Sequence, residues 1–273
     1  MNKKTLLATC CVALMGMTGV AHADLAVGIA GPMTGQYASN GDQIRKGAEQ
    51  AVAEINAKGG VLGQKLKLEV GDDACDPKQA VSVANTMVNK KIVFMHGHWC
   101  SSSTIPASDV YNAAQILMAT VSTNPKVTDR GLKNIFRIMG SDDQQGKVGG
   151  DYIADHFQGK KVAVLDDKSA YGKGLADEIA KELAAKTITP VLRESITAGE
   201  KDYTGIISKL KTAGVDVLAY GGYHTEVALL LRQAEQADLK LTVISGDTMT
   251  NSELVTAAGP AARVRRKTPR SRS

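Results

Sequence analysis

The sequence has 273 residues, a formal net charge of +5 and only three Phe and one Trp, so its cores must be mainly aliphatic. The positive charge lies at the two ends, because Lys3 and Lys4 open the chain and residues 261–273 carry six basic and no acidic side chains. Without these eight residues, 25 basic side chains face 28 acidic ones, which argues against a nucleic-acid-binding body.

Residues 1–23 have the organisation of a secretory signal peptide. The two lysines precede a run of apolar or small residues over 6–20, and Ala21-His22-Ala23 has the small-x-small pattern of a cleavage site. This run is too short to span a bilayer comfortably, and no other apolar run reaches membrane length. We therefore expect a soluble, exported protein.

The sequence then alternates between strand and helix patterns. In the first helix of this series, Ile44, Ala48, Val52 and Ile55 recur at helical spacing. A later helix has Asp76 as its cap and Pro77 in its first turn. Strands are predicted at 25–30, 65–73, 92–97, 116–120 and 134–139, and helices at 41–60, 76–91 and 102–115.

The same alternation begins again after residue 150. Repeated strand–helix units predict parallel sheets that are covered on both faces. The expected mature chain of 250 residues exceeds the usual size of one core, so we predict two α/β lobes, at 24–140 and 141–260. The second series has predicted strands at 160–167, 189–196, 215–222 and 240–247, and predicted helices at 172–186, 202–214 and 225–238.

The segments that follow the strands are the candidate binding segments, because ligands of open α/β sheets lie beyond the carboxyl ends of the strands. Residues 101–104 (SSST) begin a predicted helix, where the unpaired N–H groups suit an anion such as a carboxylate. Plain capping with water in place of a ligand is the alternative. Hydroxyl and carbonyl groups of residues 121–125 and the carboxylate of Asp247 would suit the opposite charge, so the set suits an amino-acid zwitterion. Tyr171 and Tyr223 supply aromatic walls with polar tips.

Cys75 and Cys100 remain after removal of the signal peptide. An even pair in an oxidising compartment predicts a disulfide, which would close a loop of 26 residues. Cys100 would then be neither a nucleophile nor a metal ligand. A metal site of His96, His98 and Cys100 is the alternative, since His-x-His on a strand places both rings on one face.

Motifs of the common enzyme classes are missing from the sequence. There is no G-x-S-x-G elbow, no P-loop and no H-E-x-x-H, and no cofactor is predicted. We therefore do not expect an enzyme. The alternative from another functional class is an exported hydrolase with a nucleophilic serine at 101–103.

Taken together, these stretches resemble the periplasmic leucine/isoleucine/valine-binding proteins of ABC importers, so the resemblance implies a periplasmic protein. The resemblance covers most of residues 25–259 and is carried by stretches such as DDACDPKQAVSVAN, GHWCSSST, FRIMGSDDQQG, DKSAYGKGLA and GGYHTEVALLLRQA. It implies a type I periplasmic binding fold in which two Rossmann-like lobes close on an aliphatic amino acid. It also implies an ABC permease as partner and action as a monomer. The wider family includes binders of amides and urea-like solutes, which are the alternative ligands.

The resemblance assigns a role to each candidate. Ser101 and neighbouring N–H groups would hold the α-carboxylate, while Ser122 and Thr123 lie in the segment that accepts from the α-ammonium group. Asp247 matches an acidic partner of that ammonium group. Tyr171 and Tyr223 match aromatic wall positions of the family. Cys75 and Cys100 match a disulfide of the family.

Two regions depart from the resemblance. Close leucine binders have a tyrosine immediately before the first Gly-Asp-Gln, whereas this chain has Asn40 there and Tyr37 three positions earlier. The similarity also ends at about Arg263. We expect the second lobe to be incomplete and the basic, disordered tail at 261–273 to be a frame-shifted or truncated end.

Overall fold

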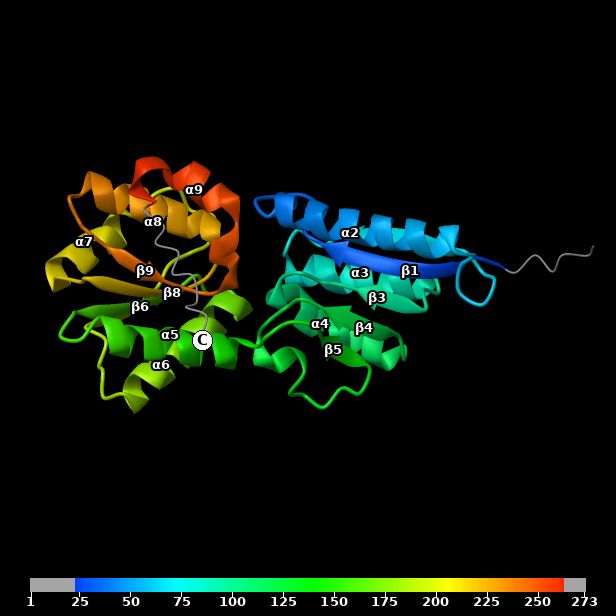
Figure 1. Cartoon of the computed structure of the whole chain (residues 1–273), viewed down its shortest axis with the longest axis horizontal. Coiled ribbons are helices and arrows are strands. Elements are labelled where there is room, and N and C mark those ends of the chain that lie inside the picture. The colour runs from blue at the N-terminus through cyan, green and yellow to red at the C-terminus, as the bar shows by residue number, and fades with distance from the viewer. Residues whose placement is uncertain (1–22, 263–273) are drawn as a thin grey trace, which may run out of the picture.

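A computed structural model describes residues 23–262 as two α/β lobes that lie side by side (Figure 1). The predicted signal peptide, except Ala23, and the tail beyond residue 262 lie outside the described residues. Within 23–262, no helix is both long and apolar enough to cross a membrane. The two predicted series of strands form two separate, entirely parallel sheets, which confirms the predicted fold class.

The first lobe is built on a five-stranded sheet of order β2-β1-β3-β4-β5. Helices α3 and α4 pack on one face, where Met87, Met95, Tyr111 and Met118 are almost fully buried. The elements are β1 (Leu25–Gly31), α2 (Ala38–Ala57), β2 (Leu66–Asp72), α3 (Pro77–Asn89), β3 (Phe94–His96), α4 (Ser101–Ala113), β4 (Leu117–Thr120), the 3-10 turn η1 (Pro125–Val127) and β5 (Ile135–Arg137).

The other face of this sheet is covered only in part. Helix α2 contacts β1 and β2, but Leu117 on β4 and Phe136 on β5 are 45% and 50% exposed. The expectation that both faces of each sheet are covered therefore fails here, because α2 is the only helix of the described chain that packs on this side of the sheet.

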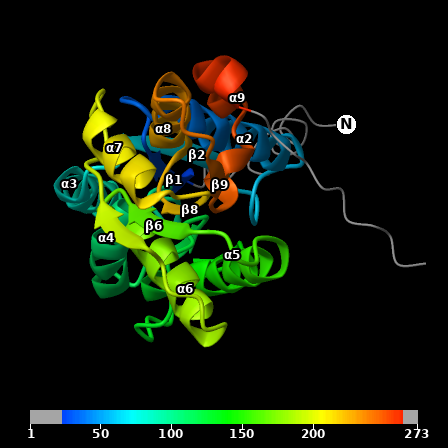
Figure 2. The ribbon, with the colours of Figure 1, turned by 90° about the vertical axis from the view of Figure 1, so that its left-hand side faces the viewer.

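The second lobe is built on a four-stranded sheet of order β7-β6-β8-β9, and both of its faces are covered (Figure 2). Side chains of β6 alternate, so Val162 and Val164 face α5 and α6 while Ala163 and Leu165 face α7 and α8. The elements are α5 (Asp142–His156), β6 (Val162–Asp166), α6 (Ala170–Ala185), β7 (Leu192–Ser195), α7 (Thr204–Ala213), β8 (Val217–Gly221), α8 (His224–Gln236), β9 (Thr242–Ile244), η2 (Asp247–Thr250), α9 (Ser252–Ala258) and η3 (Gly259–Ala261).

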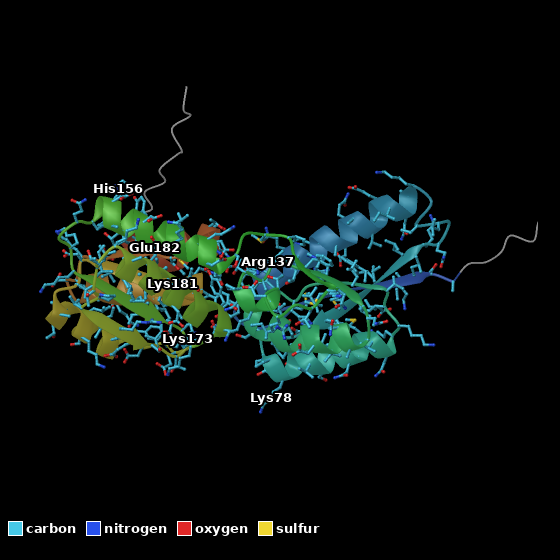
Figure 3. The ribbon with its side chains drawn as sticks, turned by 90° about the horizontal axis from the view of Figure 1, so that it is seen from below. Lys78, Arg137, His156, Lys173, Lys181 and Glu182 are labelled. Atoms are coloured by element: carbon cyan, nitrogen blue, oxygen red, sulfur yellow. A yellow bond between two sulfur atoms is a disulfide. The ribbon has the colours of Figure 1, made fainter. Side chains whose placement is uncertain are left out.

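Helix α5 is a finding that the sequence analysis did not predict. Its glycines hide the helical pattern, but Gly146 and Gly150 lie directly against α6. An added Cβ would come within 2.4 Å of Glu178 Cβ at the first glycine and within 2.6 Å of Glu182 Cβ at the second. Figure 3 shows the two helices side by side, with His156 and Glu182 labelled. The glycines allow this close packing of α5 on α6.

Candidate ligand-binding site

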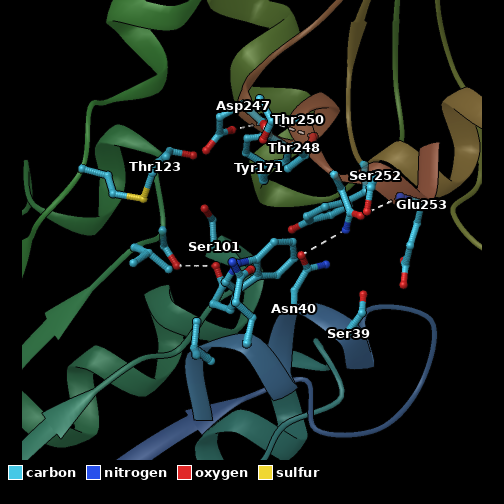
Figure 4. Close-up of a pocket in the computed structure, with 18 residues that line it drawn as sticks. Ser39, Asn40, Ser101, Thr123, Tyr171, Asp247, Thr248, Thr250, Ser252 and Glu253 are labelled. Atoms are coloured by element: carbon cyan, nitrogen blue, oxygen red, sulfur yellow. Dashed lines mark hydrogen bonds between the residues drawn. The ribbon is translucent and has the colours of Figure 1, made fainter. Parts of the chain in front are cut away.

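A cavity of about 670 Å³ lies between the two lobes (Figure 4). Its lining follows the carboxyl ends of β3, β4, β5, β6, β8 and β9, together with the start of α2, which follows β1. This is the edge at which parallel sheets bind ligands. All six residues that were predicted to bind ligand line it: Ser101, Ser122, Thr123, Tyr171, Tyr223 and Asp247.

The N-terminus of α4 forms one wall of the cavity. Cys100 is the N-cap residue, and it makes no capping hydrogen bond with its side chain because its sulfur is joined to Cys75. The Cα atoms of the two cysteines are 5.5 Å apart. Ser101, which follows, is buried and its Oγ accepts from the N–H of Asn124 at 3.4 Å. The first turn of α4 therefore keeps N–H groups for an anion in the cavity.

The loop after β4 contributes Ser122 and Thr123. The Ser122 hydroxyl contacts the carbonyl oxygen of Trp99 at 2.9 Å and that of His98 at 3.1 Å, and it also pairs with the Thr104 hydroxyl. These contacts hold the β4 loop against the start of α4. The Thr123 carbonyl accepts the N–H of Asp142 at 2.9 Å, which ties this loop to the start of α5.

Asp247 faces the cavity from the second lobe. Its Oδ1 accepts the hydroxyl of Tyr171 at 3.1 Å, and its N–H donates to Gln145 Oε1 at 2.8 Å. Gln145 Nε2 in turn donates to Asp142 Oδ1 at 3.0 Å. Burial, reinforced by the charge of Asp247, raises the pKa of Asp142 to about 7. The carboxylate of Asp247 brings negative charge to the side of the cavity opposite Ser101, where a cation is favoured.

Four aromatic rings from both lobes meet at the base of the site. The Tyr223 ring lies 4.4 Å from Tyr37, 5.1 Å from Tyr171 and 5.4 Å from Trp99, measured between centroids. All three tyrosines are almost fully buried. The predicted wall residues Tyr171 and Tyr223 are therefore brought together, while Tyr37 and Trp99 come from the first lobe and were not predicted.

The histidine–cysteine stretch does not form the alternative metal site. The His98 ring is fully buried, with Nδ1 2.5 Å from Asp73 Oδ2 and Nε2 3.3 Å from the Tyr111 hydroxyl, while Cys100 is in the disulfide. In the described part of the chain, no three His, Cys, Asp or Glu side chains are placed to hold a metal ion. The same contacts turn the His98 ring nitrogens away from the serines of α4.

The sequence analysis missed much of one end of the cavity. There Ser39 and Asn40 on α2 face Ser252 and Glu253 at the start of α9 (Figure 4). Asn40 was noted in the sequence only as a departure from the resemblance, not as a binding residue. Ser39 was missed because helix 41–60 was predicted to begin after it, and Ser252 and Glu253 were missed because α9 was not predicted. The remaining unpredicted lining residues are Gln43, Ile44, Trp99, Val121, Met139, Thr248, Thr250 and Asn251.

Comparison with known proteins agrees with this architecture. The family model described as periplasmic binding protein matches residues 24–264. The chain belongs to this family. A relative in Pseudomonas aeruginosa, named amino acid binding protein, is 48% identical over 94% of this chain and 69% of its own length.

Two further relatives carry more specific names. The Leu/Ile/Val-binding protein homolog 2 of Brucella abortus is 47% identical over 96% of this chain and 71% of its own length. Among solved structures, the branched-chain amino acid transporter substrate binding protein LivJ of Streptococcus pneumoniae, in complex with isoleucine, superposes with a TM-score of 0.77. It is 26% identical, and the match covers 86% of this chain and 68% of that one.

Proposed function

We propose that this family member is a periplasmic substrate-binding protein that captures a branched-chain or other aliphatic amino acid and delivers it to an ABC permease. The family membership and the Leu/Ile/Val names of its relatives support this ligand class. The protein is exported by the signal peptide at residues 1–23, acts as a monomer and is not an enzyme.

The observation that carries the proposal is the pair of opposite electrostatic poles across one cavity. The α4 N-terminus at Ser101 offers N–H donors, and Asp247 in the other lobe offers a carboxylate. An amino-acid zwitterion has the complementary charges. Ser101 and the α4 N–H groups bind the α-carboxylate. Asp247, the carbonyl groups near Ser122 and the Thr123 hydroxyl accept from the α-ammonium group.

Apolar side chains line the same cavity and suit an aliphatic ligand side chain. Ile44, Val121 and Met139 contribute alkyl surface, and Trp99 and Tyr223 contribute aromatic surface. Removing a branched side chain of the ligand from water contributes roughly 1.5–3 kcal/mol. The zwitterion contacts thus fix the orientation of the ligand, and the apolar contacts add affinity.

Binding proceeds by closure of the two lobes. The Ala170 N–H donates to Ser102 Oγ at 3.1 Å, and Asn124 Nδ2 donates to the Ala170 carbonyl at 2.7 Å, so the lobes contact each other directly. A ligand with contacts to both lobes binds the closed arrangement better and shifts the population toward it. Closure removes the ligand charges from water, which strengthens their pairing.

The alternative of an exported serine hydrolase is less well supported. Ser101 Oγ and Ser102 Oγ accept backbone N–H groups, and the His98 ring is engaged by Asp73 and Tyr111. No described contact gives a serine of this turn a histidine base.

Isothermal titration calorimetry of the purified protein with leucine, isoleucine and valine tests the proposal. We expect saturable one-to-one binding of at least one of them. A folded protein that binds none of the three, or that hydrolyses an ester probe at a rate abolished by Ser101→Ala, would show that the proposed function is wrong.

A further inference from the structure

One end of the cavity is polar rather than apolar. Ser39 and Asn40 reach it from α2, and Ser252 and Glu253 reach it from α9 (Figure 4). Two of these side chains have partners among the described residues, since Asn40 Oδ1 contacts Asn251 Nδ2 at 3.3 Å and Glu253 Oε2 lies 3.2 Å from His224 Nε2. The polar lining therefore bears on which amino acids the site accepts.

The hydrogen bonds at this end fix the orientation of the Asn40 amide. Asn251 is the N-cap of α9, and its Oδ1 accepts the N–H of Glu253 at 2.9 Å. Its Nδ2 is therefore the group that faces Asn40, and it donates to Asn40 Oδ1 at 3.3 Å. Asn40 Oδ1 is therefore the acceptor in this hydrogen bond, and Asn40 Nδ2 takes no part in it.

The remaining Nδ2 of Asn40 is a buried donor without an acceptor among residues 23–262. The residue is only 9% exposed and lines the cavity. Because the Asn40–Asn251 contact joins α2 to α9, opening of the lobes exposes this amide, and closure buries it again. A donor that is buried at each closure destabilises the closed state unless it meets an acceptor.

The ligand side chain is the natural source of that acceptor. A carbonyl oxygen accepts from Asn40 Nδ2, whereas a carboxylate would be repelled by the nearby carboxylate of Glu253, and an ammonium group has no lone pair to offer. An amide also carries an NH₂ group, which suits the oxygens of Glu253 and Ser252. The oxygen of a primary amide thus suits Asn40 on α2, and its NH₂ group suits Ser252 and Glu253 on α9.

We propose that the site also accepts amino acids with a primary amide side chain, asparagine or glutamine, and that Asn40 determines this specificity. The inference rests on the proposed function, because the α-carboxylate and α-ammonium groups are held at Ser101 and Asp247 as described above.

Calorimetric titration of the full chain with leucine, asparagine, glutamine and glutamate tests this inference. We expect the wild-type protein to bind leucine and at least one of the two amides, and to bind glutamate at least about tenfold more weakly than that amide. Asn40→Leu keeps a branched side chain but removes the donor. It should weaken amide binding about tenfold or more and change leucine binding less than about threefold.

Asn251→Ser is the matched control, because serine still caps α9 but does not reach Asn40. It should change leucine and amide affinities by a similar factor. Wild-type protein that binds leucine but neither amide would overturn the inference and leave the proposed function standing. The same holds if Asn40→Leu weakens all ligands equally, since the residue would then only join the lobes. Folded wild-type protein that binds no amino acid would overturn both.

Discussion

Tyr171 donates its hydroxyl to Oδ1 of Asp247 at 3.1 Å, although 76 positions separate the two residues in the chain. The tyrosine follows β6 and the aspartate follows β9, so the contact joins two strand ends of one sheet. Burial, with a further contribution from the charge of Asp247, raises the Tyr171 pKa well above its usual value. Tyr171 therefore stays a hydrogen-bond donor and orients the carboxylate.

Tyr171→Phe should weaken amino-acid binding by about tenfold, because it removes a hydrogen bond to a charged group while keeping the ring. Calorimetric titration measures the loss. Tyr220→Phe is the control, since the buried Tyr220 hydroxyl has no hydrogen-bond partner within 23–262. An equal loss of affinity in both variants would contradict the role given to Tyr171.

Asp247→Ala should weaken binding roughly 100-fold, because the ligand ammonium group would be buried in the closed lobes without its ionic partner. Ser103→Ala should change affinity less than about threefold, since the Ser103 hydroxyl is buried and makes no hydrogen bond in the described structure. The two variants are compared by titration with the same amino acid. Comparable losses would show that Asp247 does not pair with the ligand.

The disulfide should stabilise both the fold and the site. Replacing Cys75 and Cys100 by alanine should lower the free energy of unfolding by about 3–4 kcal/mol, because the unfolded chain loses the constraint on its 26-residue loop. Urea unfolding measures this change. Affinity should fall as well, since Cys100 is the residue from which α4 begins. Two reactive thiols in the native, exported protein would contradict the pairing.

Asp142 should make stability decrease as the pH rises. Its pKa is about 7 in the folded state against an ordinary value of 3.8, so the native state holds a proton that the unfolded chain releases. The contribution of this group to stability therefore falls between about pH 4 and pH 7. Asp142→Asn removes the ionisable carboxyl group. Its effect on the free energy of unfolding should therefore be more stabilising at pH 8 than at pH 4, by on the order of 2–4 kcal/mol.

Asp143→Asn is the control for this pH dependence, because a hydrogen bond from Ser141 lowers the pKa of the exposed Asp143 carboxyl. Urea unfolding at pH 4 and pH 8 gives the comparison. If the effect of Asp142→Asn on stability becomes no more favourable between pH 4 and pH 8 than that of Asp143→Asn, burial does not hold the proton on Asp142.

The glycines of α5 should differ in their tolerance of alanine. Gly146→Ala should destabilise the protein by about 1–3 kcal/mol, because its Cβ would meet Glu178 Cβ and backbone at under 3 Å. Gly149→Ala should instead stabilise it by roughly 0.5–1 kcal/mol, because its nearest contact, Ile179, lies at 3.5 Å and alanine favours the helix. Urea unfolding of both variants separates packing from helix propensity.

Most strands and helices were predicted from the sequence because their apolar spacing is regular. The cap of α3 was also correct, since Asp76 Oδ1 accepts the N–H of Gln79 at 2.8 Å with Pro77 in the first turn. Helix α5 was missed because Gly146 and Gly150 read as breakers in isolation. Glycine is needed at both positions because α6, which follows later in the chain, packs against them, and no local sequence pattern indicates that contact.

The candidate site was predicted in part. Residues directly after strands, such as Ser101 and Tyr171, were found because strand ends are recognisable in sequence. Trp99 and Asn251 were missed, since their place at the cavity depends on how the two lobes face each other. The orientation of the Asn40 amide likewise depends on a cap more than 200 positions away.

The contact that the first lobe makes with Ala170 of the second has a consequence for how this protein can evolve. Ser102 and Asn124 bind the backbone N–H and carbonyl of residue 170, not its side chain. Many amino acids can therefore replace Ala170 without loss of these bonds, whereas proline, which lacks the N–H, cannot. Positions 102 and 124 have no such freedom. Among homologues, variation should concentrate at 170 and be scarce at its two partners.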